Sequence, residues 1–213
     1  MISAMVSVLM FVACLYPVFL WVGLGFTGGL TANPPEYLIR SSGEWALVAL
    51  CLVLLATPLN RYARVSVLLL HRRMLGLFAY FYSTLHLLGW ALWEQGFMLT
   101  AMWHDVVTRW FITVGVVAFV LLTPLALTST RGWMRRLGRN WKRLHYAVYP
   151  AIALSLWHFW LVRAGKNDFF EVWVYLAVIL LLCLPRIIQS GRSLSAGNHY
   201  AMTFKVRPGR GKG

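Results

Sequence analysis

The stretch HRRMLGLFAYFYSTLHLL, residues 71–88, sets the fold class of this chain. After its two arginines it has no Lys, Arg, Asp or Glu, yet it carries a histidine near its end, His86. A second stretch, LHYAVYPAIALSLWHFWLV, residues 144–162, has the same character and carries His145 and His158. A membrane helix needs about 20 mostly apolar residues, and both stretches approach that length. They predict membrane helices that bear histidines.

The rest of the chain has a similar composition. Of 213 residues, 60% are hydrophobic and 12% are charged, which excludes an ordinary soluble domain. Charge-free runs predict an all-α integral membrane protein, a six-helix transmembrane bundle within residues 1–189, followed by a basic, flexible cytoplasmic tail over 190–213. The six predicted spans are Met5–Phe26, Trp45–Asn60, Met74–Trp93, Trp110–Thr130, Leu144–Val162 and Phe169–Pro185.

The loop charges predict the orientation of this bundle. Sixteen of the 20 Lys and Arg residues fall in one set of loops, whereas the other set holds four bases and all six acids. Cytoplasmic loops retain Lys and Arg, so both termini of this multi-pass protein are expected in the cytoplasm. The net charge of +14 is then a topology signal, and its expected partners are anionic membrane lipids rather than nucleic acid.

Ionisable side chains inside a membrane are costly, which makes the histidines the candidate functional residues. His104 and His199 lie in a predicted loop and in the tail, and His71 lies at the cytoplasmic boundary. His86 and His158 each come thirteen residues after a boundary position on helices that run in the same direction. At 1.5 Å per residue they share one depth, roughly 20 Å from the cytoplasmic boundary. Two imidazoles at one depth are suitable axial ligands for a haem iron.

The helix faces that carry these histidines are lined with small residues. Gly76, Ala79, Ser83 and Gly89 share a face with His86, and Ala147, Ala151 and Ser155 share one with His158. Close helix packing also explains small residues, but not one histidine per face at equal depth. With no CxxCH motif for covalent attachment, we expect a b-type haem.

His145 fits this arrangement less directly. An ideal helix places it roughly 140° around from His158, although Pro150 between them is expected to kink the helix. A second haem at this level would need His71, another side chain or water opposite His145. The number of haems, one or two, therefore stays open.

The six-helix plan with His86, His145 and His158 resembles the ferric-reductase-like membrane domain shared with the NADPH oxidases. The segments LTSTRGWMRRLGRNWKRLHYAVY, residues 127–149, and 71–88 resemble more narrowly the MsrQ family of haem-binding membrane subunits. That resemblance implies a multi-pass protein of the bacterial inner membrane, which transfers electrons from the quinone pool to a periplasmic molybdopterin-containing methionine-sulfoxide reductase subunit. It also implies haem ligation by the three histidines and an FMN contact at Arg72 and Arg73, where a positive-inside flank is the competing explanation. Arg72 stands where the wider family has a histidine.

Two alternatives remain at this level. A ferric-reductase-like enzyme would pass its electrons to a small external acceptor instead of a protein. A transporter or structural membrane subunit would use the histidines as a polar relay without haem, although we find neither an internal repeat nor an acid well inside a predicted span. If the chain is instead an electron carrier for a methionine-sulfoxide reductase, the substrate is reduced on the partner protein. No catalytic residue is then expected on this chain.

Overall fold

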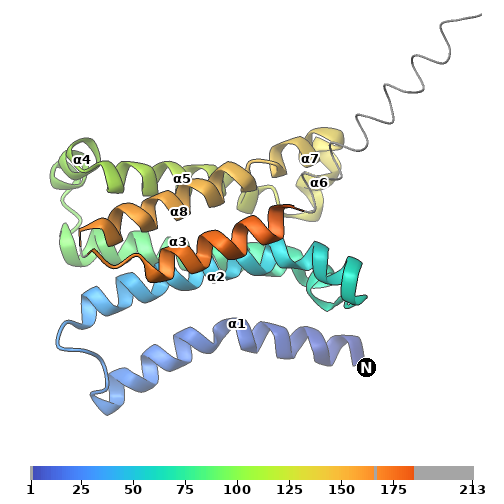
Figure 1. Ribbon diagram of the computed structural model, residues 1–213, viewed down its shortest axis with the longest axis horizontal. Helices are drawn as coiled ribbons and strands as arrows, with labels where there is room; N and C mark the ends of the chain where they lie inside the picture. The colour runs from blue at the N-terminus through green and yellow to red at the C-terminus, as the bar shows by residue number, and fades with distance from the viewer. Residues whose placement is uncertain (1, 166, 185–213) are drawn as a thin grey trace, which may run out of the picture.

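Long helices lie side by side along one axis in the computed structural model, which describes residues 2–165 and 167–184 (Figure 1). The predicted tail over 190–213, with His199, lies outside the described residues. The helices that run along the axis, and the shorter segments between them, are α1 (Ile2–Thr27), α2 (Pro34–Ala63), α3 (Val67–Gly89) with the π-helical turn η1 (Trp90–Glu94), α4 (Leu99–Thr108), α5 (Trp110–Leu127), α6 (Arg131–Leu137), α7 (Arg139–His145), α8 (Val148–Ala164) and a final helix, Phe170–Leu184.

Four of the predicted spans are confirmed as helices long and apolar enough to cross a membrane. They are Ala4–Thr27, Pro34–Ala63, Val67–Glu94 and Trp110–Leu127. The other two predicted spans correspond to α8, with 17 residues, and the shorter apolar helix Phe170–Leu184. The chain is thus an all-helical, multi-pass membrane protein over its described part, and the count of six spans stays a prediction.

α2 begins eleven residues earlier than the predicted span. The side chain of Asn33 caps it by accepting a hydrogen bond from the backbone N–H of Glu36, and two prolines occupy its first positions. Both features favour a helix start, because the first backbone N–H groups of a helix have no partner within it. The charged residues Glu36, Arg40 and Glu44 ended the apolar run in the sequence, but they do not interrupt a helix.

The predicted fifth span is broken rather than kinked. α7 ends at His145, two residues form a turn, and α8 starts at Val148. Pro150 therefore lies in the first turn of α8, where its missing N–H costs no helical hydrogen bond. The expected kink at Pro150 was wrong, since the change of direction takes place before this residue.

The core lies where α2, α3, α5, α8 and the final helix meet. Its buried side chains include Leu50 and Leu54 from α2, Ala79 from α3, and Ala151 from α8, and Leu54, Ala79 and Ala151 are fully buried. α1 lies at the edge of this group in Figure 1. Most of its apolar side chains are exposed, as suits a helix that faces lipid.

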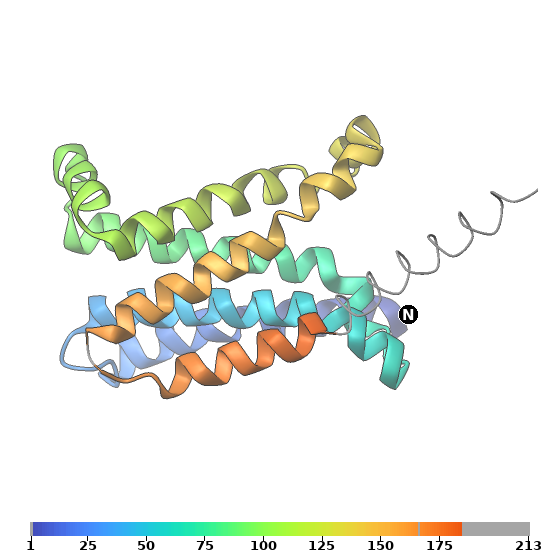
Figure 2. The same ribbon diagram turned by 45° about the horizontal axis from the view of Figure 1, so that its top comes forward.

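The two ends of the bundle carry different charges. The α2–α3 connection, α6 and α7 lie at one end, with the start of α1 (Figure 1, Figure 2). The described bases at this end are Arg61, Arg64, Arg72, Arg73, Arg131, Arg135, Arg136, Arg139, Lys142 and Arg143. All six acids lie toward the opposite end. They are Glu36 and Glu44 in the first half of α2, Glu94 of η1, Asp105 of α4, and Asp168 and Glu171 before and at the start of the final helix. We call these the basic end and the acidic end.

Candidate functional site

His86 of α3 and His158 of α8 face each other inside the bundle, as their predicted equal depth required. Their ring centres are 5.9 Å apart and the ring planes make an angle of 78°. A metal–imidazole bond is about 2 Å long and the ligating nitrogen lies about 1 Å from its ring centre, so two imidazoles on one iron have centres about 6 Å apart. The observed separation has room for one metal ion between the two rings.

Backbone carbonyls fix the orientation of both rings. Nδ1 of His86 lies 2.7 Å from the carbonyl oxygen of Ile39 on α2, and Nδ1 of His158 lies 2.6 Å from that of Phe111 on α5. A carbonyl only accepts hydrogen bonds, so each Nδ1 carries the proton and donates it. Each Nε2 is then an unprotonated nitrogen on the far side of its ring, which is the state that binds a metal.

A glycine lies beneath each histidine. A Cβ atom added at Gly43 or at Gly115 would come within 2.9 Å of Nδ1 of His86 or His158, respectively. Such a contact is too short for a real Cβ atom, so any larger residue would displace the ring. The two glycines therefore allow each imidazole to lie directly against the backbone of the neighbouring helix, within reach of its carbonyl.

Both histidines line a cavity of about 570 Å³ between α2, α3, α5 and α8. Protein cavities that bind organic ligands commonly measure about 300–1,000 Å³. Its inner part is apolar, with Leu50 and Leu122, and its outer part reaches Asn33 and Glu36 at the acidic end. The cavity thus combines an apolar interior with two nitrogen ligands and extends to a polar end.

The site is built twice along the chain. His158 follows His86 by 72 residues, and the same interval separates Gly115 from Gly43 and Phe111 from Ile39. Each histidine bonds a carbonyl 47 residues before it. Ser83 and Ser155 repeat the pattern, since both donate to the carbonyl four residues earlier, at 2.8 and 2.9 Å. The expectation of no internal repeat was wrong, because His, Gly and Ser recur at this fixed interval, although most residues between them differ.

These features together suit a haem better than a bare metal ion. Among residues 2–165 and 167–184, no group of three or more His, Cys, Asp or Glu side chains could hold a metal ion. Two imidazoles suffice only where the metal brings its remaining ligands with it, as iron does in a porphyrin. The long, mostly apolar cavity would accept the flat ring, and His86 and His158 would be the axial ligands.

The other predicted residues lie outside this cavity. His145 is half-buried at the basic end, stacked on Trp141 at 3.9 Å between ring centres, with Nδ1 3.1 Å from the Trp141 carbonyl. His71 donates from Nδ1 to the Val67 carbonyl at 2.8 Å, so its Nε2 accepts a hydrogen bond from the Ser7 hydroxyl of α1 at 2.9 Å. Arg72 is half-buried and close enough for its charge to act on His145, and Arg73 is exposed.

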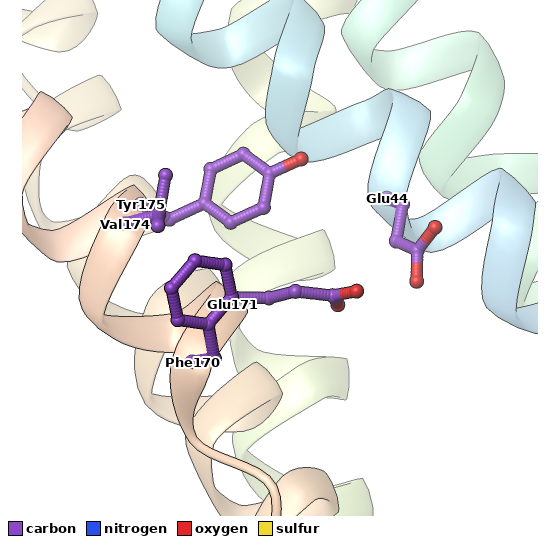
Figure 3. A pocket seen from close by; sticks show the side chains of 5 residues that line it. All are labelled: Glu44, Phe170, Glu171, Val174 and Tyr175. Atoms are coloured by element: carbon purple, nitrogen blue, oxygen red, sulfur yellow. The ribbon is translucent and has the colours of Figure 1, made fainter.

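Arg163 is a buried residue that the sequence placed only as a loop charge. It lies on α8 near the acidic end, lines the cavity, and is 6% exposed. Its guanidinium pairs with Glu44 at 3.5 Å, with Asp168 at 3.2 Å and with Glu171. Figure 3 shows Glu44 and Glu171 directed toward a smaller pocket of about 280 Å³ beside Tyr175. Arg163 therefore joins α8 to α2 and to the final helix.

Comparison with known proteins is consistent with this geometry. Residues 42–156, which contain His86 and His145, match the family model described as ferric reductase like transmembrane component. The chain is 49% identical over 174 residues to a protein of Bordetella pertussis, covering 82% of this chain and 84% of that protein. It is also 40% identical to one of Herminiimonas arsenicoxydans, over 96% and 94% of the two chains.

Both relatives are named protein-methionine-sulfoxide reductase heme-binding subunit MsrQ. A protein of Rhodospirillum rubrum with the same name is 44% identical over 88% of this chain. The chain belongs to the MsrQ family. The resemblance found in the sequence is therefore confirmed, and the membrane domain is of the ferric-reductase-like type.

Proposed function

We propose that this chain is a membrane b-type cytochrome that carries electrons across the membrane for a methionine-sulfoxide reductase. The observation that carries the proposal is the pair of imidazoles, His86 and His158, 5.9 Å apart and oriented by carbonyls so that both Nε2 atoms are free for iron. A bound haem would supply one-electron chemistry through its iron. The residues of this chain would hold the iron, keep it away from water, and set its potential by ligation and hydrogen bonding.

The family name supports a methionine-sulfoxide reductase system as the partner of this transfer. Electrons would come from quinol, pass through the bundle, and leave at the acidic end to a periplasmic molybdopterin-containing methionine-sulfoxide reductase. For His145 we propose ligation of a second haem closer to the basic end, with His71, another side chain or water opposite it. Its stacking on Trp141 holds its ring at that level of the bundle.

Arg72 and Arg73 are proposed to bind the phosphate of FMN at the basic end. Guanidinium groups form charge-assisted hydrogen bonds to phosphate, and Arg72 lies near His145. Replacement of both arginines by alanine should slow haem reduction by the donor while haem content stays normal, measured by stopped-flow absorbance. Normal reduction kinetics in a correctly inserted variant would remove the FMN site from the proposal.

The axial ligands provide the direct test. Replacement of His86 or His158 by alanine should abolish the six-coordinate, low-spin spectrum of the outer haem, because the apolar cavity offers no substitute nitrogen. The measurement is a reduced-minus-oxidised absorbance spectrum together with haem content of the purified protein. The matched control is His104→Ala, which removes an exposed histidine of α4. Unchanged spectra in both ligand variants, or a colourless wild-type protein, would refute the proposal.

A further inference from the structure

One buried polar atom of the cavity lining has no partner. Trp90, the first residue of η1, is 8% exposed and lines the cavity. Among the buried side-chain nitrogen and oxygen atoms of the described residues, the indole Nε1 of Trp90 is the one that makes no hydrogen bond. A buried donor without a partner is costly, so such groups usually meet an acceptor in the complete assembly.

The position of Trp90 relative to His86 suggests what that acceptor is. Trp90 follows His86 by four residues, which is about one helical turn or 6 Å toward the acidic end. The π-helical turn starts at this residue, and such turns occur often at functional sites. Trp90 packs against Ile112 of α5, with Met102 of α4 at the edge of the same cluster. A ligand centred between the two histidines would thus reach Trp90 about one helical turn from the iron, in the direction of the acidic end.

The arginines of the cavity lining are already occupied by carboxylates. Arg163 pairs with Glu44, Asp168 and Glu171, and Arg40 lies 3.9 Å from Glu36. A further carboxylate at Arg163 would face three like charges, which disfavours it there. Trp90, on the α4–α5 side, offers a neutral donor, and its ring packs among apolar side chains that include Ile112 and Met102.

We propose that the indole N–H of Trp90 donates a hydrogen bond to a haem propionate. This contact would set the rotation of the haem about the axis through its two ligands, with one propionate edge turned toward η1 and away from the Arg163 cluster. The inference rests on the proposed function, because it requires a haem between His86 and His158. It assigns Trp90 as a cofactor-binding residue, which the sequence had placed only within an apolar span.

The test compares two haems in two proteins. Wild-type protein and Trp90→Phe are each loaded with protohaem and with its dimethyl ester, in which both carboxylates are capped. The rate of haem loss to apomyoglobin is then measured for all four samples. We expect Trp90→Phe to lose protohaem roughly tenfold faster or more, the effect of losing a hydrogen bond to a charged group, and to match wild type when both carry the ester. Trp110→Phe, at an exposed indole outside the cavity, is the matched control and should leave all rates unchanged.

The outcomes separate this inference from the function on which it rests. A wild-type protein that binds neither haem overturns the proposed function itself. A wild-type protein that binds protohaem, with Trp90→Phe either unchanged or equally faster for both haems, overturns only the role of Trp90. If Trp90→Phe holds no haem, the wild-type rates still decide, since equal loss of protohaem and its ester would contradict a propionate contact.

Discussion

Each candidate ligand depends on one glycine of the facing helix. The Nδ1 atoms of His86 and His158 reach their carbonyls only because Gly43 and Gly115 have no side chain. The histidines were predictable from the sequence, since a fixed rise per residue gives their depth. The glycines and carbonyls could not be predicted in the same way. Finding them requires knowing which residues of two neighbouring helices lie side by side, and the pattern of a single helix does not contain this information.

Replacement of Gly43 or Gly115 by alanine should weaken haem binding. The added Cβ would lie 2.9 Å from Nδ1, so the ring must move and its bond to the carbonyl must lengthen or break. Loss of such a supporting hydrogen bond typically lowers metal affinity by about 10- to 100-fold. Haem titration of the purified variants, followed by absorbance, measures this change.

Gly76→Ala is the matched control for Gly43→Ala. A Cβ at Gly76, within α3, has no neighbour within 4 Å, so this variant should bind haem as wild type does. Equal haem affinity in Gly43→Ala, Gly115→Ala and Gly76→Ala would show that the close contact does not control the ligands.

At the scale of the elements, helix ends differed from the predictions for identifiable reasons. The charged residues at the start of α2 and the arginines at the start of α3 bounded the apolar runs, but helices continued through both. Hydropathy records what lies in lipid, whereas capping and backbone hydrogen bonds decide where a helix begins. The break between α7 and α8 lay in residues with ordinary helical propensity, so the sequence pointed to Pro150 instead.

The Arg163 cluster should hold three of these elements together. Replacement of Arg163 by methionine would leave Glu44, Asp168 and Glu171 without their shared cation at the acidic end. These carboxylates are partly exposed, so we expect a loss of about 1–3 kcal/mol, below that of a fully buried pair. The melting temperature in detergent measures it, with Arg109→Met as control, because the side chain of Arg109 is half-exposed and its ion pair with Asp105 lies within α4 and its cap. A melting temperature unchanged by Arg163→Met would show that packing alone fixes α8.

At the scale of the whole molecule, the opposite charges of the two ends predict the route of the electrons. In proteoliposomes with the acidic end outward, we expect quinol-reduced protein to be reoxidised by an oxidised periplasmic molybdoenzyme added outside. The cavity extends to Asn33 and Glu36 at the acidic end, so a haem bound between His86 and His158 would be accessible to a partner from that end. Haem absorbance after mixing reports the rate, and small ferric chelates are the comparison acceptor. Fast reoxidation by the chelates and none by the molybdoenzyme would favour the ferric-reductase-like alternative.

The 72-residue repeat has a consequence for the timing of assembly during translation. The ribosome adds about 5–20 residues per second, so the codon for His158 is read roughly 4–14 s after that for His86. During this interval the nascent chain completes both glycines and both carbonyls of the site, but it holds only the first of the two facing imidazoles. An iron held by both His86 and His158 would require α8 to be inserted beside α3. Capture of a haem between these two histidines would therefore be a late step of biogenesis, and a chain truncated before α8 would lack the second ligand.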